Sequence, residues 1–318
     1  MRYRMLSPVL IIAFNRPEQT QALVNALRTV QVPRLYVAAD APRDNVPSDS
    51  DACARTLEIF QTVDWECKVS FKVNKKNKGS YTTIPLAIDW FLSNEIEGII
   101  LEDDCIPSSS FFNFCDVLLE KYRDNENAMW INGSNAGFQS SSTTIGFMES
   151  IYGISWGWAT WRSSWNLMRR RIEAPPRNGI DKKLLSKYLG RRFLAQLFWR
   201  AMFKYAYTIR NWDYRALYGM WESGGIAFTP TVNLISNIGA ANGAVHGRRL
   251  INDKRFNLPV EEWEEAVEIH SLGISENLDR HLEKEFHHVE LLRIIKVYLI
   301  ATFPKLRTWG RFLLKKPA

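Results

Sequence analysis

Short apolar runs alternate with helix-patterned segments along roughly the first 135 residues. The first run, Val9–Phe14, is continuous and β-rich, which is typical of a central parallel strand covered on both faces. This alternation predicts an α/β domain with a mostly parallel sheet. Further strands are predicted at Leu35–Ala39, Lys68–Val73, Gly98–Leu101 and Met129–Asn132, and helices near Ala54–Phe60, Ser80–Leu92 and Phe111–Tyr122.

Composition excludes several other classes of protein. The chain has 318 residues, of which 46% are hydrophobic and 24% charged, close to the globular norm. The four cysteines have no CxxC spacing, so we expect free thiols in a reducing compartment and no zinc site. No stretch reaches the ~20 consecutive apolar residues of a spanning helix, and we expect no signal peptide. No GxGxxG follows the first run, which disfavours an ordinary dinucleotide-binding fold.

The formal net charge of +7 is concentrated at the C-terminal end. Leu291–Ala318 holds seven basic residues and no acidic one, so the rest of the chain is neutral. A generic nucleic-acid binder carries its excess on the body, so we expect no nucleic acid partner. A second basic segment, Arg162–Arg210, is compatible with an anionic ligand or with a solvated helical face.

Three adjacent acidic residues, Glu102, Asp103 and Asp104, directly follow the predicted strand Gly98–Leu101. In open α/β sheets, ligands bind beyond the carboxyl ends of the strands. Adjacent carboxylates repel one another, and Mg²⁺ or Mn²⁺ would supply the missing positive charge with phosphate oxygens as further ligands. The pattern predicts a metal-diphosphate site. The other interpretation is a solvated acidic turn before the helix at Phe111.

Several motifs, taken in their order and spacing, carry a family resemblance. They are PVLIIAFNRP (8–17), Asp40, Asn77-Lys78-Gly79, LEDDCIP (101–107), SWGWATW (155–161), NWDYR (211–215), WESGG (221–225), NLISNIG (233–239) and His246. Together they resemble GT-A nucleotide-sugar glycosyltransferases, with the nearest patterns in family-2-like bacterial transferases and N-acetylglucosaminyltransferase I. The resemblance implies a Rossmann-like, mostly parallel sheet flanked by helices over 1–247, with a nucleotide-binding half (1–135) and an acceptor half (136–247). A C-terminal helical extension with a basic amphipathic tail would occupy 248–318.

The resemblance also implies roles for individual residues. Nucleotide contacts would come from Phe14, Asn15, Arg16, Asp40, Lys78, Gly79, Glu102 and Asp103. Asp104 would ligate Mn²⁺ or Mg²⁺, and His246 would help to hold the metal or the diphosphate. Other interpretations stay open: a helix cap for Asn15, a strand end at Asp40, an ordinary turn at Lys78-Gly79 and a solvated loop position for His246.

Asp213 is the candidate catalytic base. An inverting transferase needs one carboxylate to accept the proton of the acceptor hydroxyl, and burial between the two flanking aromatic residues would raise its basicity. If Trp212–Trp221 is one helix, Glu222 points to the opposite side. The competing interpretation is a surface aspartate paired with Arg215 or Arg210.

Two aromatic segments have two interpretations each. The tryptophans of Ser155–Trp165 are either packed core near the site or an acceptor platform. Leu291–Phe303 and the basic residues beyond it are either an interfacial membrane segment or a helical hairpin packed on the body. We expect a cytoplasmic protein, peripheral on the cytoplasmic face of the inner membrane.

The sequence therefore predicts a metal-dependent, inverting glycosyltransferase, either a hexosyl- or an N-acetylhexosaminyltransferase. It would move a sugar from a nucleoside-diphosphate-sugar, with UDP favoured, to a saccharide or lipid-linked acceptor in surface polysaccharide or glycoconjugate synthesis. One alternative is a sugar nucleotidyltransferase, although Asn15-Arg16-Pro17 is not the expected glycine-rich loop. Another is a non-catalytic sugar- or lipid-binding scaffold with a degenerate site.

Overall fold

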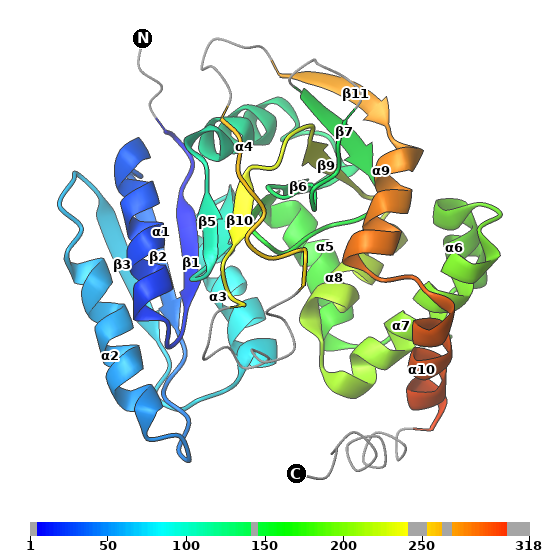
Figure 1. The fold of residues 1–318 in the computed structure, drawn as a ribbon, viewed down its shortest axis with the longest axis horizontal. Coiled ribbons are helices and arrows are strands. Elements are labelled where there is room, and N and C mark those ends of the chain that lie inside the picture. Colours follow the sequence, from blue (N-terminus) through cyan, green and yellow to red (C-terminus); the bar gives the residue numbers. More distant parts are fainter. Residues whose placement is uncertain (1–4, 141–145, 241–252, 263–268, 304–318) are drawn as a thin grey trace.

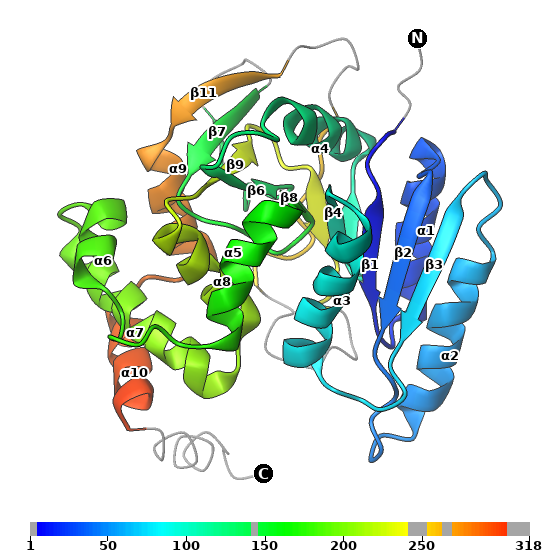
Figure 2. The same cartoon turned by 180° about the vertical axis from the view of Figure 1, so that it is seen from behind.

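The computed structural model describes residues 5–140, 146–240, 253–262 and 269–303. Within these residues, one nine-stranded sheet has the order β11-β7-β9-β6-β8-β4-β1-β2-β3, with helices on both faces (Figures 1 and 2). A separate two-stranded ribbon pairs β5 with β10. The predicted α/β class with a large, mostly parallel sheet flanked by helices is confirmed.

The parallel half of the sheet comes from the first part of the chain. Its four strands, β3, β2, β1 and β4, run parallel to one another. Their bounds, with that of the next predicted strand, β6, are β1 Val9–Ala13, β2 Arg34–Ala39, β3 Lys68–Val73, β4 Glu97–Glu102 and β6 Ala128–Asn132. Each predicted strand is therefore present, with its ends within a residue or so of the expected ones.

The other half of the sheet mixes strand directions. β8 lies between β4 and β6 and is antiparallel to both. β9 is parallel to β6, β7 is antiparallel to β9, and β11 is parallel to β7. These strands and the two-stranded ribbon have the bounds β5 Cys105–Pro107, β7 Gly146–Ser150, β8 Trp158–Trp161, β9 Ile226–Pro230, β10 Ile235–Asn237 and β11 His270–Ile274.

The two faces of the sheet are covered by different helices. In β1, Val9 and Ile11 belong to one core cluster, while Leu10 and Ile12 belong to the other, as alternation along a strand requires. The first core contains residues of α1 Pro17–Val30, α2 Ser48–Gln61 and α4 Ser109–Lys121. The second contains residues of α3 Ser80–Asn94, α5 Arg162–Glu173, α6 Lys182–Leu189, α7 Phe193–Ile209 and α8 Trp212–Glu222.

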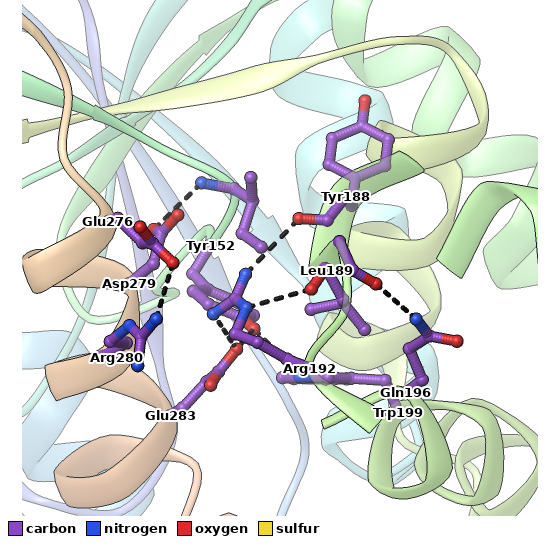
Figure 3. A network of polar contacts seen from close by, with 12 residues as sticks. Tyr152, Tyr188, Leu189, Arg192, Gln196, Trp199, Glu276, Asp279, Arg280 and Glu283 are labelled. Atoms are coloured by element: carbon purple, nitrogen blue, oxygen red, sulfur yellow. Dashed lines mark hydrogen bonds and ion pairs between the residues drawn. The ribbon is translucent and has the colours of Figure 1, made fainter. Parts of the chain in front are cut away.

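The C-terminal segment is tied to both the sheet and α7. It holds α9 Glu276–His281, η2 Leu282–Phe286 and α10 Leu291–Thr302, and it also adds β11 to the sheet edge. Figure 3 shows Arg192 and Glu283 facing each other, with Arg192 Nη1 2.6 Å from Glu283 Oε1. Tyr152 donates to the same oxygen at 2.6 Å and accepts from Trp199 Nε1 at 3.0 Å. The division of the chain at residue 247 stays a prediction.

The tryptophan segment is mainly core. Trp158, Trp161 and Trp165 are at most 2% exposed, and Trp158 stacks on Trp130 with ring centroids 3.9 Å apart. Trp156 is half-buried and packs against aromatic rings from the C-terminal segment. The core interpretation is therefore confirmed for the three buried rings.

The four cysteines are free, as expected. Among the described residues, no helix has both the length and the apolar composition needed to cross a membrane.

Candidate functional site

The candidate site lies where the chain order of the parallel strands reverses. From β1 the chain adds β2 and β3 on one side, whereas β4 pairs with the other side of β1. Such a switch point opens a crevice beyond the carboxyl ends of the two central strands. Phe14 to Arg16 follow β1 here, and Asp103 and Asp104 follow β4.

A cavity of about 390 Å³ occupies this crevice. It is lined by Ile12, Ala13, Phe14, Asn15, Arg16, Asp40, Arg43, Asn77, Gly79, Ser80, Thr83, Ile84, Glu102 and Asp103. Every residue predicted to contact the nucleotide is in this lining except Lys78, whose side chain is exposed. The structure thus brings together residues from three strand ends and from the start of α3.

Arg16 is the counter-cation of the acidic cluster. Its Nη1 lies 2.8 Å from Asp103 Oδ1 and 2.7 Å from Asp104 Oδ2, so one guanidinium bridges two carboxylates. Asp103 also accepts a hydrogen bond from the backbone N–H of Phe14 at 2.9 Å. Both aspartates are buried, so the alternative interpretation, a solvated acidic turn, is not supported.

One arginine does not balance the charge of this cluster. Burial, reinforced by the carboxylates of Asp104 and Asp103, raises the pKa of Glu102 to about 8. Burial also raises the pKa of Asp103 to about 6, although Arg16 opposes the shift. Asp213 contributes to the raised pKa of Glu102, so its carboxylate lies within electrostatic range of the cluster. The carboxyl groups of Glu102 and Asp103 therefore hold their protons more tightly here than they would in water.

Asp40 acts as an anchor for the loop that precedes α3. Its Oδ2 accepts from the backbone N–H groups of Gly79 at 2.8 Å and Lys78 at 3.1 Å, and its Oδ1 accepts from Asn74 Nδ2 at 3.0 Å. These bonds tie the end of β2 to the start of α3. A bond from Asp40 to a nucleotide base stays a prediction.

Asp49 and Arg43, which the sequence did not single out, hold the side chain of Asn15 in place. Asp49, in the first turn of α2, accepts from Asn15 Nδ2 at 2.8 Å and from Arg43 Nη2 at 2.8 Å. Arg43 in turn lies over the Phe14 ring, 5.5 Å from its centroid. Asn15 does not cap α1, because the N-cap position is Arg16. Arg43 and Asp49 lie in a polar stretch of the sequence, and nothing in its local pattern predicts that Asp49 pairs with Asn15 and Arg43.

Asp104 faces the segment that follows β10. Its backbone carbonyl accepts from the N–H of Ile238 at 2.8 Å. A Cβ at Gly239 would lie 2.1 Å from Asp104 Oδ2, so only glycine fits this close approach. His246 lies outside the described residues. Among those described, no three His, Cys, Asp or Glu side chains form a group that could hold a metal ion.

Asp213 lies in the first turn of α8, whose N-cap, Asn211, accepts from the N–H of Tyr214 at 2.9 Å. Burial raises the pKa of the Asp213 carboxyl. Arg215 is instead buried among backbone carbonyls and Tyr81, and no salt bridge joins Asp213 to an arginine in the part of the chain described. The surface ion-pair interpretation is therefore not supported.

The charged residues near Asp213 in the fold form ion pairs with other partners. Glu222 forms an ion pair with Arg171, with a closest distance of 2.5 Å. Arg169 lies 2.9 Å from Asp89, on α3. These two arginines belong to the basic segment Arg162–Arg210, and their ion pairs hold α5 to α3 and α8.

A second cavity, of about 590 Å³, lies beside the C-terminal segment. It is lined by Ala136, Gly137, Asp253, Lys254, Arg255, Leu258, His281, Glu285 and His288. Next to the lining residue Leu258, the N–H of Asn257 donates to the carbonyl of Asn237, on β10, at 2.9 Å. Next to the lining residue His288, the ring of His287 lies 5.9 Å from that of Tyr214.

The chain matches no protein-family model and no curated protein. Among solved structures, it is similar to mannosyltransferase PcManGT from Pyrobaculum calidifontis in complex with GDP-Man and Mn²⁺, with 12% identity over 70% of each chain and a TM-score of 0.34. It is similar to mouse xyloside xylosyltransferase 1, with 12% identity over 68% of this chain and 81% of that one and a TM-score of 0.31. A UDP-glucose pyrophosphorylase complexed with UDP-glucose gives 9% identity over 46% of this chain and 58% of that one, with a TM-score of 0.25. These likenesses are distant, with at most 12% identity.

Proposed function

We propose that this protein is a nucleotide-sugar glycosyltransferase whose donor binds at the β1/β4 switch point. The observation that carries the proposal is the 390 Å³ cavity, in which the residues after β1, β2 and β4 converge on a buried acidic cluster. A nucleoside diphosphate bound with a divalent cation suits such a crevice, because the cation offsets both the carboxylates and the phosphates.

The donor contacts follow the lining of the cavity. Phe14, Asn15 and Arg16 would border the base and ribose, and Asp103 would face the ribose or the donor sugar. Lys78, whose side chain is exposed beside the cavity, would reach the nucleotide from its rim. We favour a UDP-sugar as the donor, carrying a hexosyl or N-acetylhexosaminyl group.

Mn²⁺ or Mg²⁺ is part of the proposal because a single guanidinium pairs with both Asp103 and Asp104 and also lies within electrostatic range of Glu102. Burial is the main cause of the raised pKa values of Glu102 and Asp103, and the neighbouring carboxylate of Asp104 adds to both shifts. Asp104 and His246 would hold the ion, and the ion would stabilise the negative charge that develops on the leaving diphosphate. In its absence Arg16 neutralises part of the cluster.

Asp213 would act as the general base of an inverting transfer. The acceptor oxygen forms a bond to the anomeric carbon, the bond from that carbon to the diphosphate oxygen breaks, and the acceptor proton moves to the Asp213 carboxylate. Burial supports this role, since it raises the pKa of Asp213 and makes its carboxylate a better base. The carboxylate also lies within electrostatic range of Glu102, at the donor cavity.

The acceptor would be a saccharide, free or lipid-linked, in surface polysaccharide or glycoconjugate synthesis. We assign it to the second cavity, whose lining residue His288 directly follows His287 in the chain. The ring of His287 lies 5.9 Å from that of Tyr214, the neighbour of the candidate base. An acceptor on a lipid carrier would place the enzyme on the cytoplasmic face of the inner membrane.

The test is transfer from a panel of nucleotide-sugars, with the products separated by mass. Mn²⁺-dependent binding and hydrolysis of one UDP-sugar, lost in Asp104→Ala, would support the proposal. Formation of a nucleotide-sugar from a nucleoside triphosphate and a sugar phosphate would instead identify a nucleotidyltransferase. Binding of sugar without turnover of any donor would identify a non-catalytic scaffold.

A further inference from the structure

An exposed apolar surface on α7 and α10 is not used by the proposed reaction. The two helices pack side by side, as Figures 1 and 2 both show. Nine large hydrophobic side chains on or beside them are at least 37% exposed. They are Phe193, Leu194, Leu197, Leu291, Leu292, Ile295, Tyr298, Leu299 and Phe303. We call this set the α7–α10 surface.

The inner side of α10 explains why the helix is held in place at all. Ile294 and Val297 are buried in the core cluster that includes residues of α7, and the Arg293 guanidinium lies 5.9 Å from the centroid of the Phe198 ring. The Arg192–Glu283 pair holds the preceding η2 turn to the start of α7. The α7–α10 surface is therefore the outer side of a fixed helix pair.

Exposure on this scale costs free energy in water. Single exposed hydrophobic residues are ordinary, but nine of them on two contacting helices are typical of an interaction site. Leu292 is 81% exposed and Phe193 is 67% exposed, so neither contributes much to the core. The surface needs a partner that offers an apolar medium.

The charges identify the partner. α7 and α10 carry four basic residues, Arg200, Lys204, Arg293 and Lys296, and no acidic one. The sequence after residue 303 adds five more basic residues and again no acidic one. Apolar side chains flanked by Lys and Arg are typical of helices that lie in the interface of an anionic bilayer. At 1.5 Å per residue, α10 is about 18 Å long, too short to span the ~30 Å hydrocarbon core.

We propose that the α7–α10 surface docks the protein onto an anionic lipid bilayer. The hydrophobic side chains enter the boundary between headgroups and acyl chains, and the basic side chains contact the lipid phosphates. This inference rests on the proposed function for its purpose, access to a lipid-linked acceptor, but lipid binding itself is measured without any sugar transfer.

The experiment is flotation of the full chain with phosphatidylcholine vesicles, with and without phosphatidylglycerol. We expect binding to the anionic vesicles and about tenfold weaker binding for the double variant Phe193→Asp/Leu292→Asp. Lys296→Glu should weaken binding to anionic vesicles while leaving any binding to neutral ones unchanged. Phe71→Asp is the matched control, because Phe71 is 45% exposed on β3, at the opposite side of the molecule from α10 (Figure 1).

Two results would overturn the proposal. One is vesicle binding that is equally strong in the double variant and the wild type, since the docking surface would then lie elsewhere, for example in the segment after residue 303. The other is a wild-type chain that ignores vesicles but forms a dimer that the double variant does not, as measured by light scattering; the surface would then pair two copies. Lipid binding without sugar transfer would support the docking surface and contradict the proposed function. Sugar transfer without lipid binding would support the proposed function and contradict the docking surface.

Discussion

The guanidinium of Arg16, just after β1, lies 2.8 Å from the carboxylate of Asp103, at the end of β4. Asp103 is 2% exposed, and the same nitrogen of Arg16 also reaches Asp104. The pair therefore joins the two central strands at their carboxyl ends. It also makes the acidic cluster compatible with a folded chain before any ligand binds.

Replacing Arg16 should destabilise the fold more than breaking a surface pair does. Arg16→Gln leaves two buried carboxylates without a counter-charge, and we expect a loss of about 2–3 kcal/mol in the free energy of unfolding near pH 8. Urea denaturation measures this loss. The control is Arg28→Gln, because Arg28 and Asp64 form an exposed pair at the same 2.8 Å separation, which should cost less than about 1 kcal/mol. Equal losses in the two variants would contradict the importance of the Arg16 pair.

The stability of the metal-free protein should fall as the pH rises from about 5 to about 8. The pKa of Glu102 is raised from 4.5 to about 8, and that of Asp103 from 3.8 to about 6. The folded state thus keeps protons that the unfolded chain has already released, so its advantage is full below about pH 4 and is lost as these groups ionise. Urea denaturation across this range measures the effect.

Glu102→Gln removes one of these proton-binding groups, so the variant should lose less stability over the same pH range. Mn²⁺ should restore stability to the wild type at pH 8 more than at pH 5, because only the ionised carboxylates bind the ion. A wild-type free energy of unfolding that does not change with pH would show that ionisation of Glu102 and Asp103 does not destabilise the folded state. A lack of response to Mn²⁺ at both pH values would count against the metal site.

Much of the first half of the fold could be predicted because its signals are local. Continuous apolar runs such as Val9–Ala13 mark buried parallel strands whatever their neighbours are. β7 has the mixed sequence GFMES, and β11 is mostly exposed, so neither has a pattern that distinguishes it from a loop. Their strand character comes from pairing with β9 and with each other, which the local sequence does not encode.

In the candidate site, too, the sequence predicts the local motif but not the contacts that the fold creates. The cluster Glu102 to Asp104 is visible in the sequence as a motif, but the sequence indicates no counter-charge for it other than a metal ion. Recognising Arg16 as a partner requires knowing that β1 and β4 are neighbours. The anchoring contacts of Asp40 are likewise absent from the local sequence, because its backbone partners at Lys78 and Gly79 become neighbours only when α3 packs on the sheet. The nucleotide contact of Asp40 stays a prediction.

Asp40→Asn should separate the anchoring role from base recognition. An amide cannot accept all the bonds that the carboxylate accepts, so the partly buried N–H groups of Lys78 and Gly79 lose an acceptor, at a cost of about 1 kcal/mol. Thermal unfolding measures this cost, and Asp44→Asn, at an exposed position nearby, is the control. If Asp40→Asn keeps wild-type stability and only raises KM for the nucleotide-sugar, the residue is a ligand contact and not an anchor.

Asp213→Asn should lower kcat for sugar transfer by about 10²–10⁴-fold, because the amide cannot accept the proton of the acceptor hydroxyl. The fold should survive, since the N-cap bond of α8 comes from Asn211 and the variant side chain keeps an acceptor oxygen for the N–H of Tyr214. Binding of the donor should change little, whereas the acid limb of the pH–rate profile should disappear. Glu222→Gln, nine residues further along and paired with Arg171, is the matched control and should keep its activity. If the control loses activity and Asp213→Asn does not, the base lies on the other side of α8; if neither variant changes kcat, a base outside this helix accepts the proton.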